Sequence, residues 1–89
     1  MFQLTESAKG ELQSRLEEKG PGTFIRMKMR DSCFAKVRVS LDDTVQPNDM
    51  EIEVEGLQFR IDPEQIHYFQ KKELDFRPDN TGFKEFDIR

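Results

Sequence analysis

Cys33 is the only cysteine of this sequence, and it offers the one soft, ionisable ligand atom in the chain. It lies in the turn of the segment MKMRDSCFAKVRV, residues 27–39, between Arg30 and Lys36. Nearby cations favour the thiolate, the form that binds metals and reacts with partner thiols, whereas the neighbouring Asp31 opposes it. Cys33 is therefore the candidate ligand for a metal or a partner thiol.

The position of Cys33 also fits a core residue. Apolar and charged residues alternate in this segment, so residues of equal parity share one face of a strand pair. Cys33 has the parity of four apolar residues: Met27, Met29, Ala35 and Val37. A free cysteine packs as a small hydrophobe in such a place. The residues alone leave open whether Cys33 is a ligand or a core side chain.

A metal site would need ligands besides Cys33. Iron-sulfur clusters are generally held by four ligands, mostly thiolates, so two chains with one cysteine each supply only half of them. His67, Asp31 and Asp62 carry the other ligating atoms that could contribute, although a single histidine on a short polar helix is usually a surface side chain. A stable cluster held by this chain alone is therefore not expected.

A basic face is the second candidate site. Alternation places Arg26, Lys28 and Arg38 on the outer side of one strand pair, and Phe34 shares that parity. A neighbouring segment carries outward glutamates at positions 51, 53 and 55, so cross-strand charge pairing is one explanation. The other explanation is a docking face for an acidic partner protein, with Phe34 as its exposed aromatic residue.

Length and composition exclude several classes of protein. A chain of 89 residues predicts one domain, residues 1–89. The net charge of −4 argues against nucleic-acid binding. No apolar run is long enough to span a membrane and no signal peptide is recognisable, which predicts a cytoplasmic protein with no membrane partner. We find neither a glycine-rich phosphate loop nor a nucleophile–base pair, so we do not expect an enzyme.

The elements that must position these residues begin with a helix. After a short arm through Phe2 and Leu4, Thr5 is the expected N-cap, and the apolar stripe of Ala8, Leu12 and Leu16 predicts a helix that ends at Gly20. Residues 23–30 and 35–41 then alternate with a period of two, which predicts a hairpin.

A second strand pair is expected at residues 50–62, with its turn at Glu55–Gly56. Asp62 and Gln65 have the spacing of a capping box, which predicts a helix of about two turns. Residues 73–88 then predict a strand through Leu74 and Phe76, a turn, and a last strand from Phe83 toward Ile88. The expected fold class is β-rich α+β, and ten residues are expected to share its core: Leu12, Leu16, Met27, Val37, Val39, Ile52, Val54, Leu57, Phe59 and Ile61.

The order of these elements resembles that of the HesB-like family, the A-type iron-sulfur cluster carrier and assembly proteins. The resemblance covers nearly the whole chain: FQLTESAKGELQ at the start, GTFIRMKMR followed by a cysteine, EGLQFRIDPEQIHYFQKKELDF, and GFKEFDI at the end. The block from Gly56 to Phe76 is its most specific part.

This resemblance implies a HesB-like β-sandwich with one N-terminal helix and one short helix. It also implies iron or an iron-sulfur cluster carried between subunits by three cysteines, with iron-sulfur assembly proteins or apo-acceptor proteins as partners. Only the first cysteine has a counterpart here, Cys33; the family's C-terminal C-x-C pair is absent from the sequence, and Ser32 and Phe34 replace the glycines that flank the family's cysteine. The chain thus resembles a degenerate member.

Two functions remain open at this point. One is iron-sulfur cluster assembly, in which Cys33 from two subunits of a homodimer, or from one subunit and a partner, binds iron or a cluster. The other is a metal-free protein-interaction or regulatory module that retains the fold and has lost the site.

Overall fold

The computed structural model describes residues 2–30, 36–78 and 80–89. One α-helix, one short 3₁₀-helix and seven strands occur in these ranges. In chain order they are β1 (Gln3–Leu4), α1 (Glu6–Lys19), β2 (Phe24–Met29), β3 (Lys36–Asp42), β4 (Met50–Val54), β5 (Leu57–Ile61), η1 (Ile66–Tyr68), β6 (Glu73–Pro78) and β7 (Lys84–Ile88).

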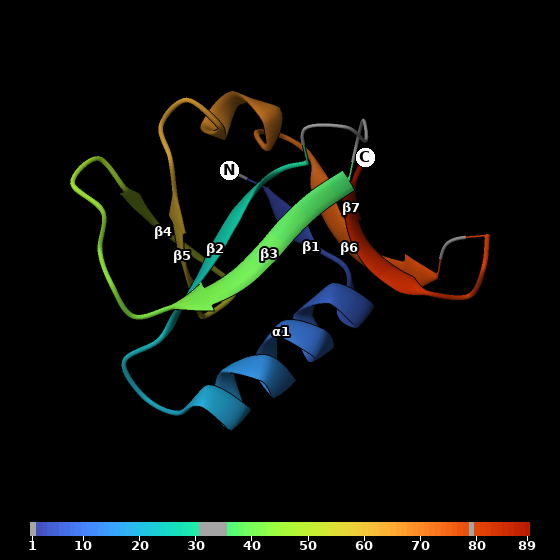
Figure 1. Cartoon of the computed structure of the whole chain (residues 1–89). Coiled ribbons are helices and arrows are strands. Elements are labelled where there is room, and N and C mark those ends of the chain that lie inside the picture. Colours follow the sequence, from blue (N-terminus) through green and yellow to red (C-terminus); the bar gives the residue numbers. More distant parts are fainter. Residues whose placement is uncertain (1, 31–35, 79) are drawn as a thin grey trace.

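The seven strands form one mixed sheet in the order β1-β6-β7-β3-β2-β5-β4 (Figure 1). The β1–β6 and β2–β5 pairs are parallel, and the other pairs are antiparallel. The sheet curls on itself, since Phe2 beside edge strand β1 meets Phe59 of β5 edge to face, with ring centroids 5.1 Å apart. This confirms the β-rich α+β class; the layers of the expected sandwich are two halves of one nearly closed sheet.

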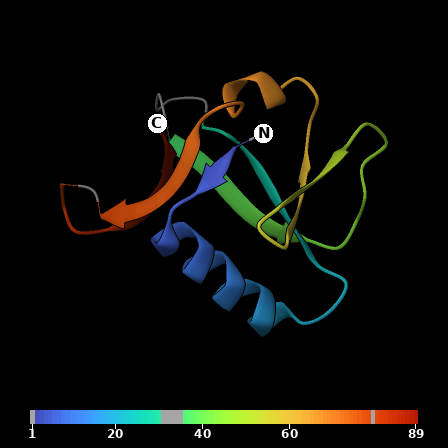
Figure 2. The same ribbon diagram turned by 180° about the vertical axis from the view of Figure 1, so that it is seen from behind.

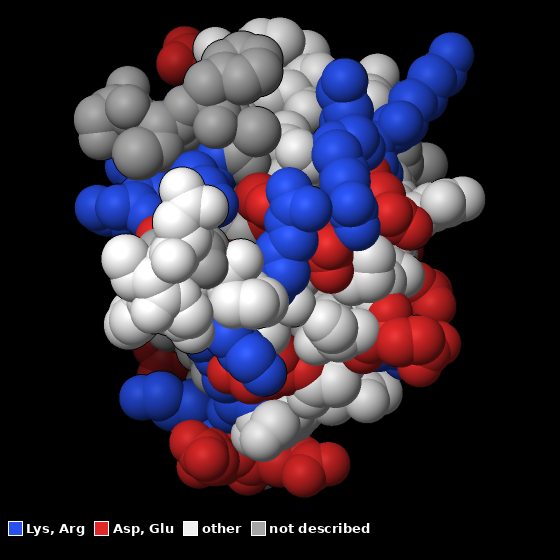
Figure 3. All heavy atoms as spheres, turned by 90° about the vertical axis from the view of Figure 1, so that its right-hand side faces the viewer, with Lys and Arg blue, Asp and Glu red and all other residues white. Residues whose placement is uncertain are grey.

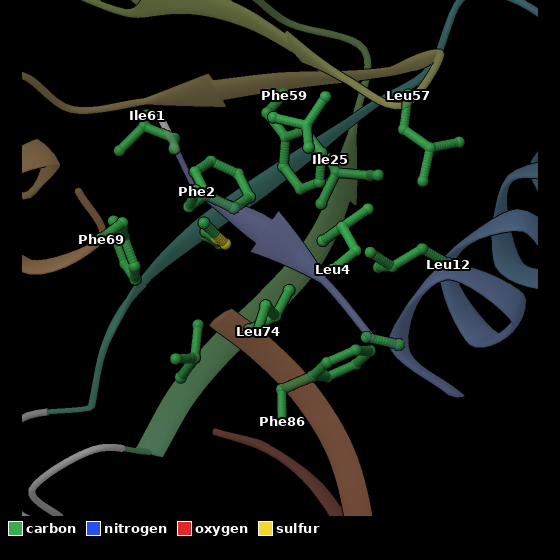
Figure 4. Packing of buried hydrophobic residues seen from close by; sticks show 14 of the residues in the cluster. Phe2, Leu4, Leu12, Ile25, Leu57, Phe59, Ile61, Phe69, Leu74 and Phe86 are labelled. Carbon is green, nitrogen blue, oxygen red and sulfur yellow. The ribbon is translucent and has the colours of Figure 1, made fainter. Parts of the chain in front are cut away.

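The core lies inside this curled sheet (Figure 4). The strand alternation was predicted correctly: Ile25, Met27 and Phe59 are buried, and all ten expected core residues belong to the apolar cluster or pack against it. Four further residues are buried that were not among the ten expected core residues: Phe2, Phe69, Leu74 and Phe86.

Helix α1 covers one open side of the sheet (Figure 2). As predicted, the Thr5 hydroxyl accepts a hydrogen bond from the Ala8 N–H at 3.2 Å. Gly20 ends the helix at φ 86°, and its N–H donates to the carbonyl of Leu16 at 3.0 Å. Ala8 and Leu12 are fully buried, so the stripe read from the sequence is the packing face.

The turn between β4 and β5 also follows the prediction. Glu55 and Gly56 both have positive φ, 52° and 83°, as the two central residues of a type I′ hairpin turn require. This conformation sets the register in which Val54 faces Leu57.

Two expectations about the second half of the chain are wrong. The expected two-turn helix is a single 3₁₀ turn, because Gln65 does not close a capping box: its Oε1 accepts from the Met29 N–H of β2 at 2.9 Å. Asp62 Oδ1 accepts only from the Glu64 N–H. The last strand starts at Lys84, and Phe83 lies before it with 70% of its surface exposed.

Among the described residues, no helix has the length and apolar character needed to cross a membrane.

Candidate metal-binding hairpin and its surroundings

Cys33 lies outside the described residues, together with Asp31 and Phe34. The structure does describe both ends of the segment that contains them. The N–H of Arg30 donates to the carbonyl of Lys36 at 3.0 Å, so the chain leaves β2 and enters β3 at adjacent points. Arg30 and Lys36 are thus the described residues on either side of the segment that contains the candidate ligand.

Arg30 and Lys36 are both paired with carboxylates of β7. Arg30 Nη1 lies 3.3 Å from one carboxylate oxygen of Glu85, and Lys36 Nζ lies 3.0 Å from the other. Lys36 Nζ also lies 3.9 Å from Asp87 Oδ2. Since carboxylates already offset both cations, the positive potential that they offer to the segment between them is smaller than the sequence suggested.

The C-terminal end of β7 lies beside this hairpin end. Lys36 pairs with Asp87 and Val37 with Phe86 across the β3–β7 ladder. Two residues beyond Asp87, Arg89 exchanges backbone hydrogen bonds of 3.0 and 3.1 Å with Glu73 of β6. Residues 36 and 87–89 therefore gather at one end of the sheet, where the C-terminus is marked in Figure 1.

Two buried carboxylates face each other in the same region. Asp75 and Asp87 are directly opposed in the β6–β7 ladder and are 7% and 3% exposed. Arg89 Nη2 contacts Asp75 Oδ2 at 2.6 Å, and Arg77 Nε donates to Asp87 Oδ2 at 2.7 Å. Figure 3 shows basic and acidic side chains interspersed on this side of the molecule.

These contacts keep Asp75 ionised. Burial is the strongest single influence and opposes ionisation, but hydrogen bonds from the Thr5 hydroxyl and the Phe76 N–H, with the charges of Arg89 and Arg77, lower the pKa of Asp75 below its ordinary value. The hydrogen bond and charge of Asp87 raise the pKa of Arg77. Both carboxylates thus belong to an ion-pair network.

Metal-ligating side chains are not gathered elsewhere in the described ranges. Asp87 Oδ1 is buried and has no hydrogen-bond partner there, but no group of three His, Cys, Asp or Glu side chains is placed to hold a metal ion. Exposed His67 lies on η1, with its ring centroid 4.0 Å from that of Tyr68. Asp62 is exposed at the start of the same turn.

Arg26, one residue of the expected docking face, already binds acidic residues of its own chain. Its Nε lies 3.1 Å from Asp42 Oδ2, its Nη1 and Nη2 donate to the two oxygens of Asp49 at 2.7 and 2.9 Å, and Nη2 also donates to the carbonyl of Thr44. The hydrogen bonds that Arg26 donates to Asp49 are the largest cause of the raised pKa of Arg26, and the same bonds lower the pKa of Asp49. The sequence signal for this pairing was the aspartate-rich loop that follows β3.

Lys28 and Arg38 are arranged differently. They face each other across the β2–β3 ladder, both exposed, and neither has an ion pair within the described ranges. Phe34, the aromatic member of the expected face, is not among the described residues. Like charges opposed in a sheet are unfavourable, so Lys28 and Arg38 form a place where an acidic group would bind favourably.

The model of a family described as iron-sulphur cluster biosynthesis matches residues 1–87. An uncharacterised protein encoded in the nifU 5′ region of Cereibacter sphaeroides is 32% identical over 88 residues, covering 93% of this chain and 83% of that protein. The iron-binding protein IscA of Xenorhabdus nematophila is 33% identical over 85 residues, covering 91% and 79%.

Solved structures show the same fold. A solution structure of a protein from Aquifex aeolicus has a TM-score of 0.75 and 28% identity, covering 99% of this chain and 89% of that one. Crystal structures of IscA with a [2Fe-2S] cluster and of Escherichia coli SufA give TM-scores of 0.69 and 0.63. Their identities are 22% and 19%; they cover 100% and 99% of this chain, and 81% and 78% of their own. At such identities the two crystal structures show a likeness of fold alone.

Proposed function

The chain belongs to the iron-sulphur cluster biosynthesis family, and from this premise we propose that it is a cytoplasmic binding protein that takes up and passes on iron or an iron-sulfur cluster. It acts as a carrier and catalyses no reaction of its own. Its partners are the proteins that assemble clusters and the apo-proteins that accept them.

The ligand that this chain contributes is the Cys33 thiolate. Clusters generally need four ligands, and each chain has one cysteine. Cys33 of two chains, or of one chain and a partner, therefore holds the metal together with thiolates from elsewhere. Such incomplete ligation gives weak and readily reversible binding, which suits a protein that transfers its cargo.

The observation that carries this proposal is the family match over residues 1–87, which includes the segment with the only cysteine. The geometry of the described residues supports it. The resemblance implies thiolates at two places, the Cys33 segment and the C-terminal region. The ends of that segment, Arg30 and Lys36, lie beside the end of β7. A metal bound by the Cys33 segment would therefore be close to the C-terminal region, where the family has its other ligands and where a partner could supply them.

Anaerobic reconstitution with ferrous iron and sulfide tests the proposal. The wild-type chain and Cys33→Ser are compared with and without glutathione, which supplies the missing thiolates. We expect wild type to retain substoichiometric iron with visible thiolate-to-iron absorption that increases with glutathione. Cys33→Ser loses both while its circular dichroism stays unchanged.

A second pair of variants examines the other ligands. His67→Ala and Asp62→Asn should retain as much iron as wild type. If Cys33→Ser also retains the wild-type amount, Cys33 is not the ligand and this mechanism is wrong. If neither the wild type nor any variant binds iron under these conditions, the second function considered from the sequence, a metal-free interaction module, is the correct one. Lys28 and Arg38, which lack acidic partners in the described ranges, are the observation that favours this second function.

A further inference from the structure

The sheet opens between β3 and β7. Their ladder contains only the pairs Lys36–Asp87 and Val37–Phe86, although β3 continues to Asp42. Beyond Val37 the two strands diverge, and α1 crosses the open side (Figures 1 and 2). Beyond Val37, none of the described strands pairs with this edge of β3, so its backbone there offers hydrogen-bonding groups to an added strand.

A groove with an apolar floor occupies this opening. Its volume is about 250 Å³, and Val37 and Val39 of β3 line it together with Phe76 and Phe86. Arg15 of α1 lies over the two rings, 5.7 Å from the centroid of Phe76 and 5.1 Å from that of Phe86. Phe83, which is 70% exposed, stands at the border of the groove.

The charged residues that line the groove are mostly cations. They are Arg15, Arg30, Arg38 and Lys84, and the one acidic lining residue is Glu85. Arg15 is paired with Glu11 and Arg30 with Glu85. Exposed Arg38 and Lys84 have no ion pair within the described ranges, in a chain whose net charge is −4.

We propose that this groove binds an extended acidic segment of a partner protein. The segment adds as a strand to the free edge of β3, its apolar side chains contact the partly exposed Val39 and Phe76, and its carboxylates pair with Arg38 and Lys84. The apolar floor distinguishes this ligand from a nucleic acid, whose phosphates would need cations alone. The interaction does not depend on Cys33 or on bound metal, so it is independent of the carrier mechanism.

A fluorescein-labelled octapeptide of alternating valine and glutamate is the probe, and fluorescence polarisation measures its binding to the whole chain. We expect saturable binding that weakens as salt rises. In the double variant Arg38→Glu/Lys84→Glu the affinity falls at least about tenfold, because like charges then face the peptide. Lys72→Glu, the same kind of charge change at an exposed residue before β6 that does not line the groove, binds as wild type does.

Two further peptides separate charge from strand addition. Replacing the glutamates by glutamine should abolish most of the binding, and replacing alternate valines by proline should do the same, since proline donates no backbone hydrogen bond. Equal binding of either peptide, or wild-type affinity in a correctly folded Arg38→Glu/Lys84→Glu variant, would overturn the proposal. So would a wild-type dimer that this variant converts to a monomer, because the occupant would then be a second copy of the chain.

Discussion

At the scale of single residues, similar cations on one strand face have different roles. Arg26 has 23% of its side chain exposed and is bound to Asp49, whose side chain is 3% exposed. Lys28, two residues further along β2, is exposed, faces Arg38 and has no acidic partner in the described ranges. Arg26 therefore fixes the loop after β3, whereas Lys28 contributes charge to the surface.

This difference predicts a large loss of stability from replacing Arg26 and almost none from replacing Lys28. Arg26→Gln leaves the carboxylate of Asp49 buried without its cation, so we expect the free energy of unfolding to fall by about 2 kcal/mol. Lys28→Gln removes a like-charge contact and should change it by less than about 0.5 kcal/mol. Urea denaturation of both variants measures the two values, and equal effects would show that Arg26 does not hold the loop.

At the scale of elements, local chemistry predicted most of what the structure contains. The Thr5 cap, the Gly20 end of α1 and the turn at Glu55–Gly56 each depend on residues close in sequence, and each was predicted. Gln65 was misinterpreted because its side chain has two possible partners, and the one it bonds, the Met29 N–H, lies 36 positions away. No spacing rule within a short window contains that information.

The glycines of two elements provide a matched test. Gly56 has φ 83° in its turn, so Gly56→Ala should destabilise the fold by about 1 kcal/mol, the cost of a left-handed conformation for a residue with a Cβ. Gly10 lies inside α1 with nothing within 4 Å of an added Cβ. Gly10→Ala should therefore stabilise the protein by about 0.5–1 kcal/mol.

Thermal and urea denaturation of the two alanine variants measure these changes. A stabilised Gly56→Ala would mean that the turn between β4 and β5 does not need its positive φ.

At the scale of the whole molecule, the curled sheet depends on contacts between distant strands. Phe59 is fully buried and meets Phe2 from the other end of the strand order. The sequence predicted Phe59 as a core residue from its alternation. It did not predict Phe2, because the alternating arm of Phe2 and Leu4 is too short to show which face is buried, and the pairing of β1 with β6 joins residues distant in sequence.

We expect Phe59→Ala to reduce the free energy of unfolding by about 3–5 kcal/mol, because a large buried ring leaves a cavity. Tyr68→Ala removes an aromatic ring that is 44% exposed and serves as the control, with a change of less than about 0.5 kcal/mol. An unchanged urea midpoint for Phe59→Ala would contradict the assignment of β5 to the core.

The pairing of β1 with β6 also determines when the fold can be completed during synthesis. The Thr5 hydroxyl donates to Asp75 Oδ1, seventy positions along the chain, and the Gln3 N–H donates to the carbonyl of Lys72. On the ribosome, the β2–β3 and β4–β5 hairpins can form from neighbouring residues as they emerge, whereas β1 has no strand to join until β6 has left the exit tunnel. Contacts of such long sequence separation form slowly. The apolar side of the nascent sheet, including the place that Phe2 fills, therefore remains open to chaperones until β6 has emerged.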